Sequence, residues 1–92
     1  MGFQDTFKAL SDKTRRKILE TLKDGRLTAG EIAAHFNMTA ATVSHHLAVL
    51  RDSGLISDEK VGKHIYYELN MSVVDEILRW ISGLGGEQHE KN

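Results

Sequence analysis

The 92-residue chain has no cysteine, no proline and no long apolar run. Without cysteine it cannot form a disulfide or a thiolate metal site, so we expect a protein of the reducing cytoplasm. No stretch approaches the roughly 20 apolar residues that span a bilayer, and no export signal follows the first methionine, so we expect no stable membrane insertion. Repeats and low-complexity segments are also absent, and the length predicts one small domain of consecutive short elements.

The charge is balanced overall but uneven along the chain. The formal net charge is -1, yet residues 1–51 carry eight Lys/Arg against five Asp/Glu, whereas residues 52–92 carry four against eight. Local potential, rather than net charge, governs binding to nucleic acid. The distribution therefore allows a basic face on a nearly neutral protein.

The first half of the chain has the spacing and the boundary residues of short helices. Apolar residues recur at helical intervals around Phe3 and Phe7, and again through "KILETL". Ser11 and Asp12 interrupt the pattern and favour a helix start, while "TAGE" from Thr28 has the Thr-x-x-Glu form of a capping box. A turn at residues 37–38 then precedes a helix that Thr39 begins and Gly54 ends; its inward residues are Val43, Leu47 and Leu50.

The second half predicts a β-hairpin followed by one more helix. "LISDEK" and "KHIYYELN" are β-favouring runs around a turn with Gly62 at its tip. A last helix begins at Asn70 or Ser72, and its apolar residues cover an arc of roughly 160°, more than one small core needs. Gly83 and the two glycines that follow predict its end. We therefore expect a domain over residues 1–86 and a disordered tail over 87–92.

Two short helices joined by a tight turn and followed by a hairpin indicate a winged helix-turn-helix. The predicted fold is mainly α with a small β-hairpin (α+β), in the order α-α-α-α-β-β-α. The outward arc of the second helix of the motif carries Ala41, Ser44 and His45, with Thr42 to one side. Small and hydrogen-bonding side chains of this kind suit close approach to base edges.

Several linked motifs resemble one bacterial repressor family. "TVSHHLAVLRDSGLI" and "KVGKHIYYELN" are similar to the Ser-x-His-Leu-x-x-Leu-Arg, Gly-Leu-Ile and Tyr-Tyr signatures of the ArsR/SmtB family. "FKALSDKTRRKILETL" resembles its amino-terminal motif, with Lys13 where proline is usual. The resemblance covers residues 3 to about 81 and is closest to the cysteine-poor autorepressor branch.

This resemblance implies a homodimeric, sequence-specific DNA-binding repressor of transcription that acts on a palindromic operator, autorepression included, and has no enzyme activity. Together with the outward arc and the wing charges, it predicts DNA contacts from Thr39, Ala41, Thr42, Ser44, His45, His46, Arg51, Lys60, Lys63 and His64. Together with the wide apolar arc, it predicts a dimer interface made by the first and last helices through Phe3, Phe7, Val73, Ile77, Trp80, Ile81 and Leu84.

Metal and catalytic sites are disfavoured, and we expect no cofactor. Adjacent residues on a helix diverge by about 100°, so His45 and His46 cannot easily bind one ion. The family's thiolate positions fall on Thr28 and Gly30, and its last-helix ligands would fall near Asn70, Ser72 and Gly83, none of which suits the metal. Ser44 lacks the strained turn of a nucleophile.

Other readings of these residues stay open at this stage. His45 could be a solvated surface histidine, and His46 could pack or cap rather than meet a phosphate. The basic run at residues 14–17 could be solvated or could form structural salt bridges. A winged-helix module that binds another protein, or a sensor for an unrecognised effector, would be the alternative functions.

Overall fold

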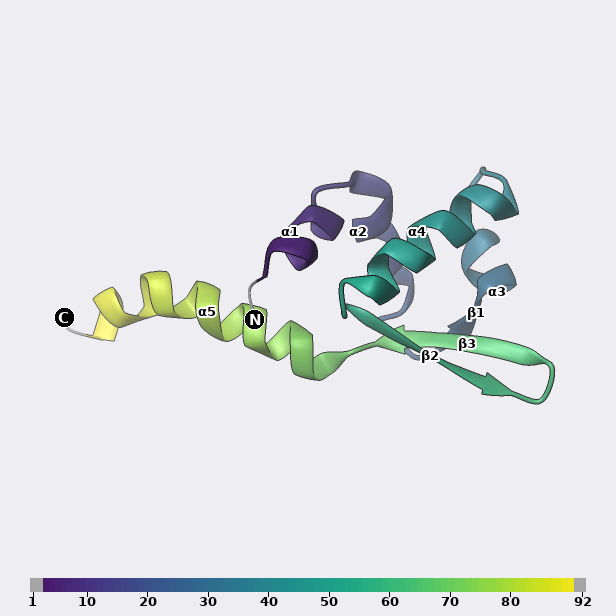
Figure 1. Cartoon of the computed structure of the whole chain (residues 1–92). Helices are drawn as coiled ribbons and strands as arrows, with labels where there is room; N and C mark the ends of the chain where they lie inside the picture. The colour runs from purple at the N-terminus through teal and green to yellow at the C-terminus, as the bar shows by residue number, and fades with distance from the viewer. Residues whose placement is uncertain (1–2, 91–92) are drawn as a thin grey trace.

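The computed structural model describes residues 3–90, which form five helices and three short strands. The elements, in chain order, are α1 (Gln4–Leu10), α2 (Lys13–Thr21), β1 (Leu27–Thr28), α3 (Ala29–Ala33), α4 (Ala40–Asp52), β2 (Ile56–Val61), β3 (His64–Leu69) and α5 (Met71–Glu90). Helices α1 to α4 gather on one side of the hairpin, and α5 projects in the opposite direction from the hairpin tip (Figure 1). This arrangement confirms the predicted α+β winged helix-turn-helix.

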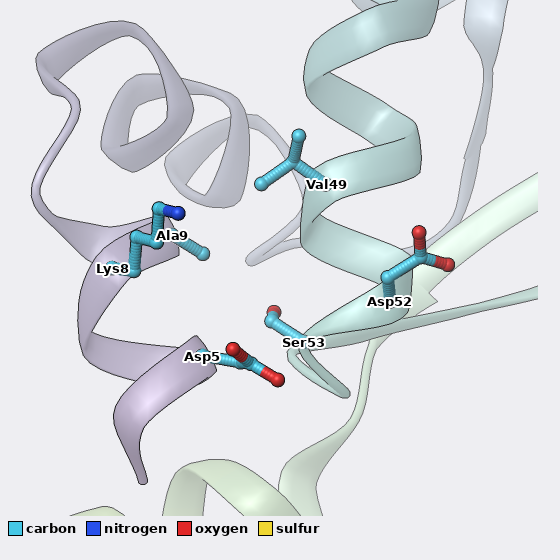
Figure 2. Close-up of a pocket in the computed structure, with 6 residues that line it drawn as sticks. All are labelled: Asp5, Lys8, Ala9, Val49, Asp52 and Ser53. Atoms are coloured by element: carbon cyan, nitrogen blue, oxygen red, sulfur yellow. The ribbon is translucent and has the colours of Figure 1, made fainter.

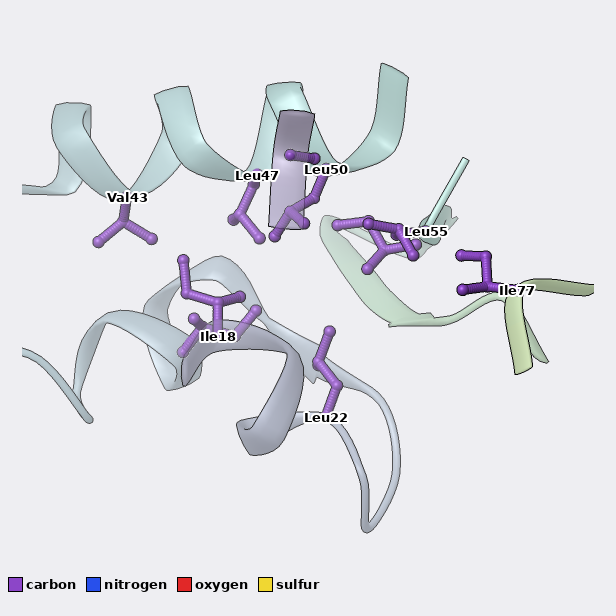
Figure 3. Packing of buried hydrophobic residues seen from close by; sticks show 10 residues of the cluster. Ile18, Leu22, Val43, Leu47, Leu50, Leu55 and Ile77 are labelled. Carbon is purple, nitrogen blue, oxygen red and sulfur yellow. The ribbon is translucent and has the colours of Figure 1, made fainter. Parts of the chain in front are cut away.

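One face of α4 forms the centre of the hydrophobic core. Val43, Leu47 and Leu50 are at most 1% exposed, as their helical spacing predicts. They point toward Ile18 of α2, while the core continues past Leu55 to α5 (Figure 3). Full burial of an aliphatic side chain contributes about 1.5 to 3 kcal/mol, so these contacts fix which side of α4 faces outward.

Side-chain caps begin the three helices that build the motif. The Asp12 carboxylate accepts a hydrogen bond from the Arg15 amide at the start of α2. Thr28 and Glu31 form the complete capping box of α3, and Thr39 accepts from the Thr42 amide at the start of α4. The predicted helix starts at these positions are therefore confirmed.

The sheet has three strands in the order β1-β3-β2, all antiparallel. The pairing of Val61 with His64 leaves a two-residue turn, in which Gly62 has φ +65°. A glycine with positive φ at the first turn position is typical of a type II′ hairpin turn. The sequence-based element order omitted β1, whose Leu27 and Thr28 pair with Tyr67 and Tyr66. A two-residue strand has no alternation of its own and forms only because β3 lies beside it.

Helix α5 continues past the glycines at which we expected it to end. It runs to Glu90, and Gly83 and Gly85 are not among the glycines with positive φ. The predicted stop was therefore wrong, because a glycine ends a helix only where the chain adopts a left-handed conformation. The tail predicted over residues 87–92 ends in residues 91–92, which lie outside the described residues; its disorder stays a prediction.

Candidate nucleic-acid interface

The outward face of α4 presents a continuous set of exposed, small or polar residues. Ala41, Thr42, Ser44 and His45 are all exposed, on the side opposite the buried Val43 and Leu47. The hydroxyls of Thr39 and Thr42 lie 2.9 Å apart and bond each other. Ser44 and His45 make no side-chain hydrogen bond within residues 3–85, so their polar atoms are available to an external partner.

His46 occupies the flank of α4 rather than its outward face. Its side chain is half-buried, and its Nδ1 atom lies 3.4 Å from Nη1 of Arg15. The ring centroids of His45 and His46 are 5.8 Å apart, and the two ring planes are tilted by 55°. His46 therefore contacts Arg15 within the domain, and its contact with DNA stays a prediction.

The basic run that begins α2 is structural at two positions. Arg15 Nε donates to the Ala9 carbonyl at 2.8 Å, and Arg16 Nη1 donates to the Leu10 carbonyl at 2.7 Å. Both acceptors belong to the last turn of α1, whose carbonyls have no partner within the helix. The two arginines therefore bind α1 to α2, in place of the salt bridges considered from the sequence.

The start of α2 also holds a carboxyl group with a shifted pKa. The pKa of Asp12 lies below its usual value of 3.8, first because the Arg15 amide donates to the carboxylate. Burial of the carboxylate raises the pKa, but by less than the hydrogen bond lowers it. The positive charges of Arg15 and His46 lower the pKa further.

Two arginines connect the hairpin to the rest of the domain. Arg51, at the end of α4, lies 3.3 Å from a carboxylate oxygen of Asp58 on β2. Arg26 lies 3.5 Å from Glu59 and stacks over the Tyr66 ring at 4.5 Å. In the free protein Arg51 is paired with the hairpin, and the DNA contact that we predicted for it stays a prediction. Sequence reasoning missed Arg26, because its partner lies 33 positions away.

The basic side chains at the hairpin tip are exposed. Lys60, Lys63 and His64 surround the Gly62 turn, and no salt bridge engages them in the part of the chain that the structure describes. Asp58 and Glu59, by contrast, are each paired with an arginine. The pairing offsets the negative charge of β2 and leaves a net positive tip.

A second surface, formed by α1 and α5, is apolar. The rings of Phe3, Phe7 and Trp80 form a cluster with centroid distances of 5.7 to 6.1 Å. Phe7 is 39% exposed and Trp80 48% exposed. The outer side of α5 adds three further exposed residues, which are Leu78, Ile81 and Leu84.

Two residues of α5 differ from the predicted interface set. Ile77 is only 6% exposed and belongs to the core of the single chain, so it has little surface left for a partner, and its place in the interface stays a prediction. Leu78, which we did not assign to the interface, is 55% exposed. Val73 is half-buried against the core. We name the exposed set Phe7, Leu78, Trp80, Ile81 and Leu84 the α1/α5 apolar surface.

Hollows also mark the surface of the described residues. One, of about 300 Å³, lies between α1 and the end of α4, where Asp5, Lys8 and Asp52 surround Ser53 (Figure 2). The neighbouring Thr6 hydroxyl donates to the Ser53 carbonyl at 3.3 Å. Within the described residues, no group of three or more His, Cys, Asp or Glu side chains could hold a metal ion. Nor does any helix there have the length and apolarity needed to cross a membrane.

Comparison with known sequences identifies the family. The profile of the bacterial regulatory proteins of the arsR family matches residues 12–58. The chain is 49% identical over 77 residues to the transcriptional repressor SdpR of Bacillus subtilis, covering 84% of this chain and 86% of that protein. It is 38% identical over 72 residues to an arsenical resistance operon repressor of Staphylococcus aureus, covering 78% and 69%.

Solved structures agree with this assignment. An ArsR-like transcriptional regulator from Rhodococcus superposes with a TM-score of 0.82 at 28% identity, covering 97% of this chain and 84% of the other. The homodimeric winged helix-turn-helix DNA-binding domain of Mb0332 from Mycobacterium bovis gives 0.74 at 26% identity, covering 97% and 82%. The chain therefore belongs to the arsR family of bacterial regulatory proteins and is a winged helix-turn-helix transcriptional regulator rather than an enzyme.

Proposed function

We propose that this protein is a homodimeric repressor that binds an inverted-repeat operator through α4 and the hairpin. The observation that carries the proposal is the outward face of α4. Its exposed residues are small or hydrogen-bonding, and the buried Val43, Leu47 and Leu50 hold that face outward. A major groove about 12 Å wide admits a helix whose outer residues are of this size.

Base recognition falls to Ser44 and His45. Their polar atoms have no partner among residues 3–85, and both side chains can donate or accept hydrogen bonds. Ala41 and the methyl group of Thr42 can contact a thymine methyl. Thr39, which caps the helix, sits where the N-terminus of a reading helix meets the phosphate backbone.

The hairpin supplies affinity that does not depend on sequence. Lys60, Lys63 and His64 bring positive charge to its tip, while Arg51 and Arg26 neutralise the acids nearer the body. Phosphate contacts of this type release counterions from DNA and give most of the salt dependence of binding. The tip of the hairpin would follow the backbone beside the groove that α4 occupies.

Dimerisation uses the α1/α5 apolar surface. Five large hydrophobic side chains exposed together on a small domain are typical of an interface. A domain of 92 residues also gains stability when it buries surface against a second copy. Two-fold symmetry would place the two reading helices about 34 Å apart, which requires an inverted repeat.

Repression would follow from steric occlusion of a promoter by the bound dimer. The Bacillus subtilis relative is described as a transcriptional repressor, and the Staphylococcus aureus relative as an operon repressor. We further propose that the protein represses its own gene, which requires an operator in the promoter of that gene. The protein would act in the cytoplasm, where its operator is.

Some relatives are named for resistance to arsenicals or cadmium, and the residues of this chain at the family's thiolate positions do not suit the binding of such ions. Proteins named for arsenical and cadmium resistance are among the relatives. At the thiolate positions of the family, this chain has Thr28, whose hydroxyl caps Glu31, and Gly30, which has no side chain. Neither provides a soft ligand, so we propose that release from DNA does not use a thiolate site.

Selection of bound sites from random duplex DNA tests the proposal. We expect the wild-type protein to enrich an inverted repeat whose half-sites lie one helical turn apart, and the folded double variant Ser44→Ala/His45→Ala to enrich none. Enrichment of an asymmetric site, or of no duplex at all, would contradict the proposed function.

A further inference from the structure

The guanidinium of Arg15 is held in place at the junction of α1 and α2. Its Nε donates to the Ala9 carbonyl at 2.8 Å and its Nη2 to the Lys8 carbonyl at 3.3 Å. The backbone amide of the same residue donates to Asp12 at 3.0 Å. Two hydrogen bonds of the guanidinium, on a backbone that is itself bonded to Asp12, leave little freedom to the remaining nitrogen, Nη1, which faces α4.

Nη1 lies 3.4 Å from Nδ1 of His46. A guanidinium has only donors and is always charged, so this contact is a hydrogen bond only when Nδ1 carries no proton. The neutral ring then has its proton on Nε2, because the hydrogen bond at one nitrogen determines which tautomer is present. The other charged or titratable groups near the ring are the Asp12 carboxylate and His45.

The second ring nitrogen of His46 is not fully buried. Nε2 has no hydrogen-bond partner among the described side chains and backbone, and none of their polar side-chain atoms is both buried and unpaired. Since the ring itself is half-buried, Nε2 must lie in its exposed part. A donor with a defined direction therefore projects from the flank of α4.

We propose that Arg15 is a positioning residue that holds His46 in the Nε2–H tautomer, so that His46 donates to a phosphate oxygen of the operator. This inference rests on the proposed function for its DNA partner. A phosphate is the acceptor because His46 lies on the flank of α4 and not on the outward face that meets base edges. Phosphate contacts from the sides of a reading helix fix its register in the groove.

The tautomer is tested first, without DNA. Long-range ¹H–¹⁵N spectra of the ¹⁵N-labelled full chain are recorded at pH 8, above the usual titration range of imidazole. We expect wild-type His46 to show an unprotonated Nδ1 and a protonated Nε2, and Arg15→Met to raise the fraction with Nδ1 protonated. A wild-type ring protonated mainly on Nδ1 would overturn the proposal.

The DNA contact is tested with amides that imitate one ring nitrogen each. Glutamine places its NH₂ group near the position of Nε2, whereas asparagine reaches only that of Nδ1. On the selected operator at fixed salt, we expect His46→Asn to weaken binding about tenfold, the effect of losing one hydrogen bond to a charged group. We expect His46→Gln to stay within about threefold of wild type. An equal loss for both variants would show that Nε2 makes no contact.

The role of Arg15 is tested with a matched control. Arg15→Met removes two bonds to carbonyls of α1 and Arg16→Met removes one, and both remove one positive charge, but only Arg15 touches His46. Arg15→Met should weaken binding in the wild-type background and not further in the His46→Asn background, while Arg16→Met should leave affinity unchanged. The same loss from Arg15→Met in both backgrounds would contradict the coupling. Failure of wild type to select any duplex would instead overturn the proposed function and the phosphate contact, and the free-protein spectra would still decide the tautomer.

Discussion

Asp12 shows how much one side chain contributes to the start of a helix. Its carboxylate accepts from the Arg15 amide, and that hydrogen bond is the main reason its pKa lies below 3.8. A lowered pKa means that folding favours the ionised form. The stabilisation is therefore complete above the pKa of the unfolded chain and is lost as the pH falls through the lower pKa of the folded protein.

Replacing Asp12 tests this capping role. Asp12→Ala should lower the free energy of unfolding by about 1 kcal/mol at pH 7, because the first-turn amide loses its acceptor. Asp12→Asn keeps a capping oxygen and should cost less. Denaturant unfolding from pH 7 to pH 3 should show the difference between wild type and Asp12→Ala shrinking on acidification. A difference that is constant down to pH 3 would mean that the charge of Asp12 plays no part.

His45 is the residue whose change should alter sequence preference. His45→Ala should cost about 1 to 3 kcal/mol of specific binding and relax the preference at one position of each half-site. Ser44→Ala should also relax the site preference, as its proposed base contact requires, whereas an even loss of affinity for all sequences would place Ser44 on a phosphate. Both variants should stay folded, because both side chains are exposed. An unchanged site preference for His45→Ala would remove this residue from base recognition.

At the scale of elements, α4 and the hairpin are joined into one unit. Arg51 links the end of α4 to β2 through Asp58, and β3 pairs with β1 just before the capping box of α3. Exposed ion pairs of this kind contribute at most about 1 kcal/mol each. These contacts orient the hairpin: they hold it beside the reading helix, and the hairpin tip extends beyond the Arg51–Asp58 pair and the β1–β3 pairing.

The lysines at the tip should contribute affinity without specificity. Lys60→Ala/Lys63→Ala should lower affinity for every sequence and reduce the slope of log affinity against log salt by about one unit per lost phosphate contact. Lys17→Ala, on the exposed side of α2, is the control for the loss of one positive charge. A salt slope equal to that of wild type in the double variant would place the hairpin off the DNA.

The whole molecule is elongated, and its length comes from α5. The principal extents are 52 × 25 × 24 Å, and α5 reaches away from the body on the side opposite the hairpin tip (Figure 1). A helix that projects with Leu78, Ile81 and Leu84 exposed is not stabilised on that side by the single chain. A second copy would cover this side and would hold the two reading helices at a fixed distance.

Charged residues on α5 should therefore separate the dimer. Leu78→Glu/Ile81→Glu should give monomers in sedimentation and collapse specific affinity, because joining two half-site contacts supplies most of it. Leu78 is changed in place of Ile77, whose burial in the core would make a charge there unfold the single chain. Val61→Glu, an exposed apolar residue of the hairpin, is the control and should still sediment as a dimer. Wild-type operator affinity from a monomeric variant would contradict both the dimer and the inverted repeat.

The sequence by itself determined the local features of this protein. The caps at Asp12, Thr28 and Thr39, the inward stripe of α4 and the Gly62 turn depend on residues within a few positions of one another, so spacing and residue type were sufficient. The family motifs likewise lie in continuous stretches, which is why the winged helix-turn-helix and its regulatory role could be predicted from them.

Tertiary structure alone decided the features that join distant segments. Arg15 meets His46 across 31 positions, and Arg26 meets Glu59 across 33. β1 exists because β3 lies beside it, and neither residue of β1 forms a pattern that reveals it. The phase of α5 against the core separates Ile77 from Leu78, which are adjacent in sequence and equally apolar. Ile77 is buried and Leu78 is exposed because packing against the core determines the rotation of α5 about its axis. The spacing of apolar residues in the sequence does not specify that rotation.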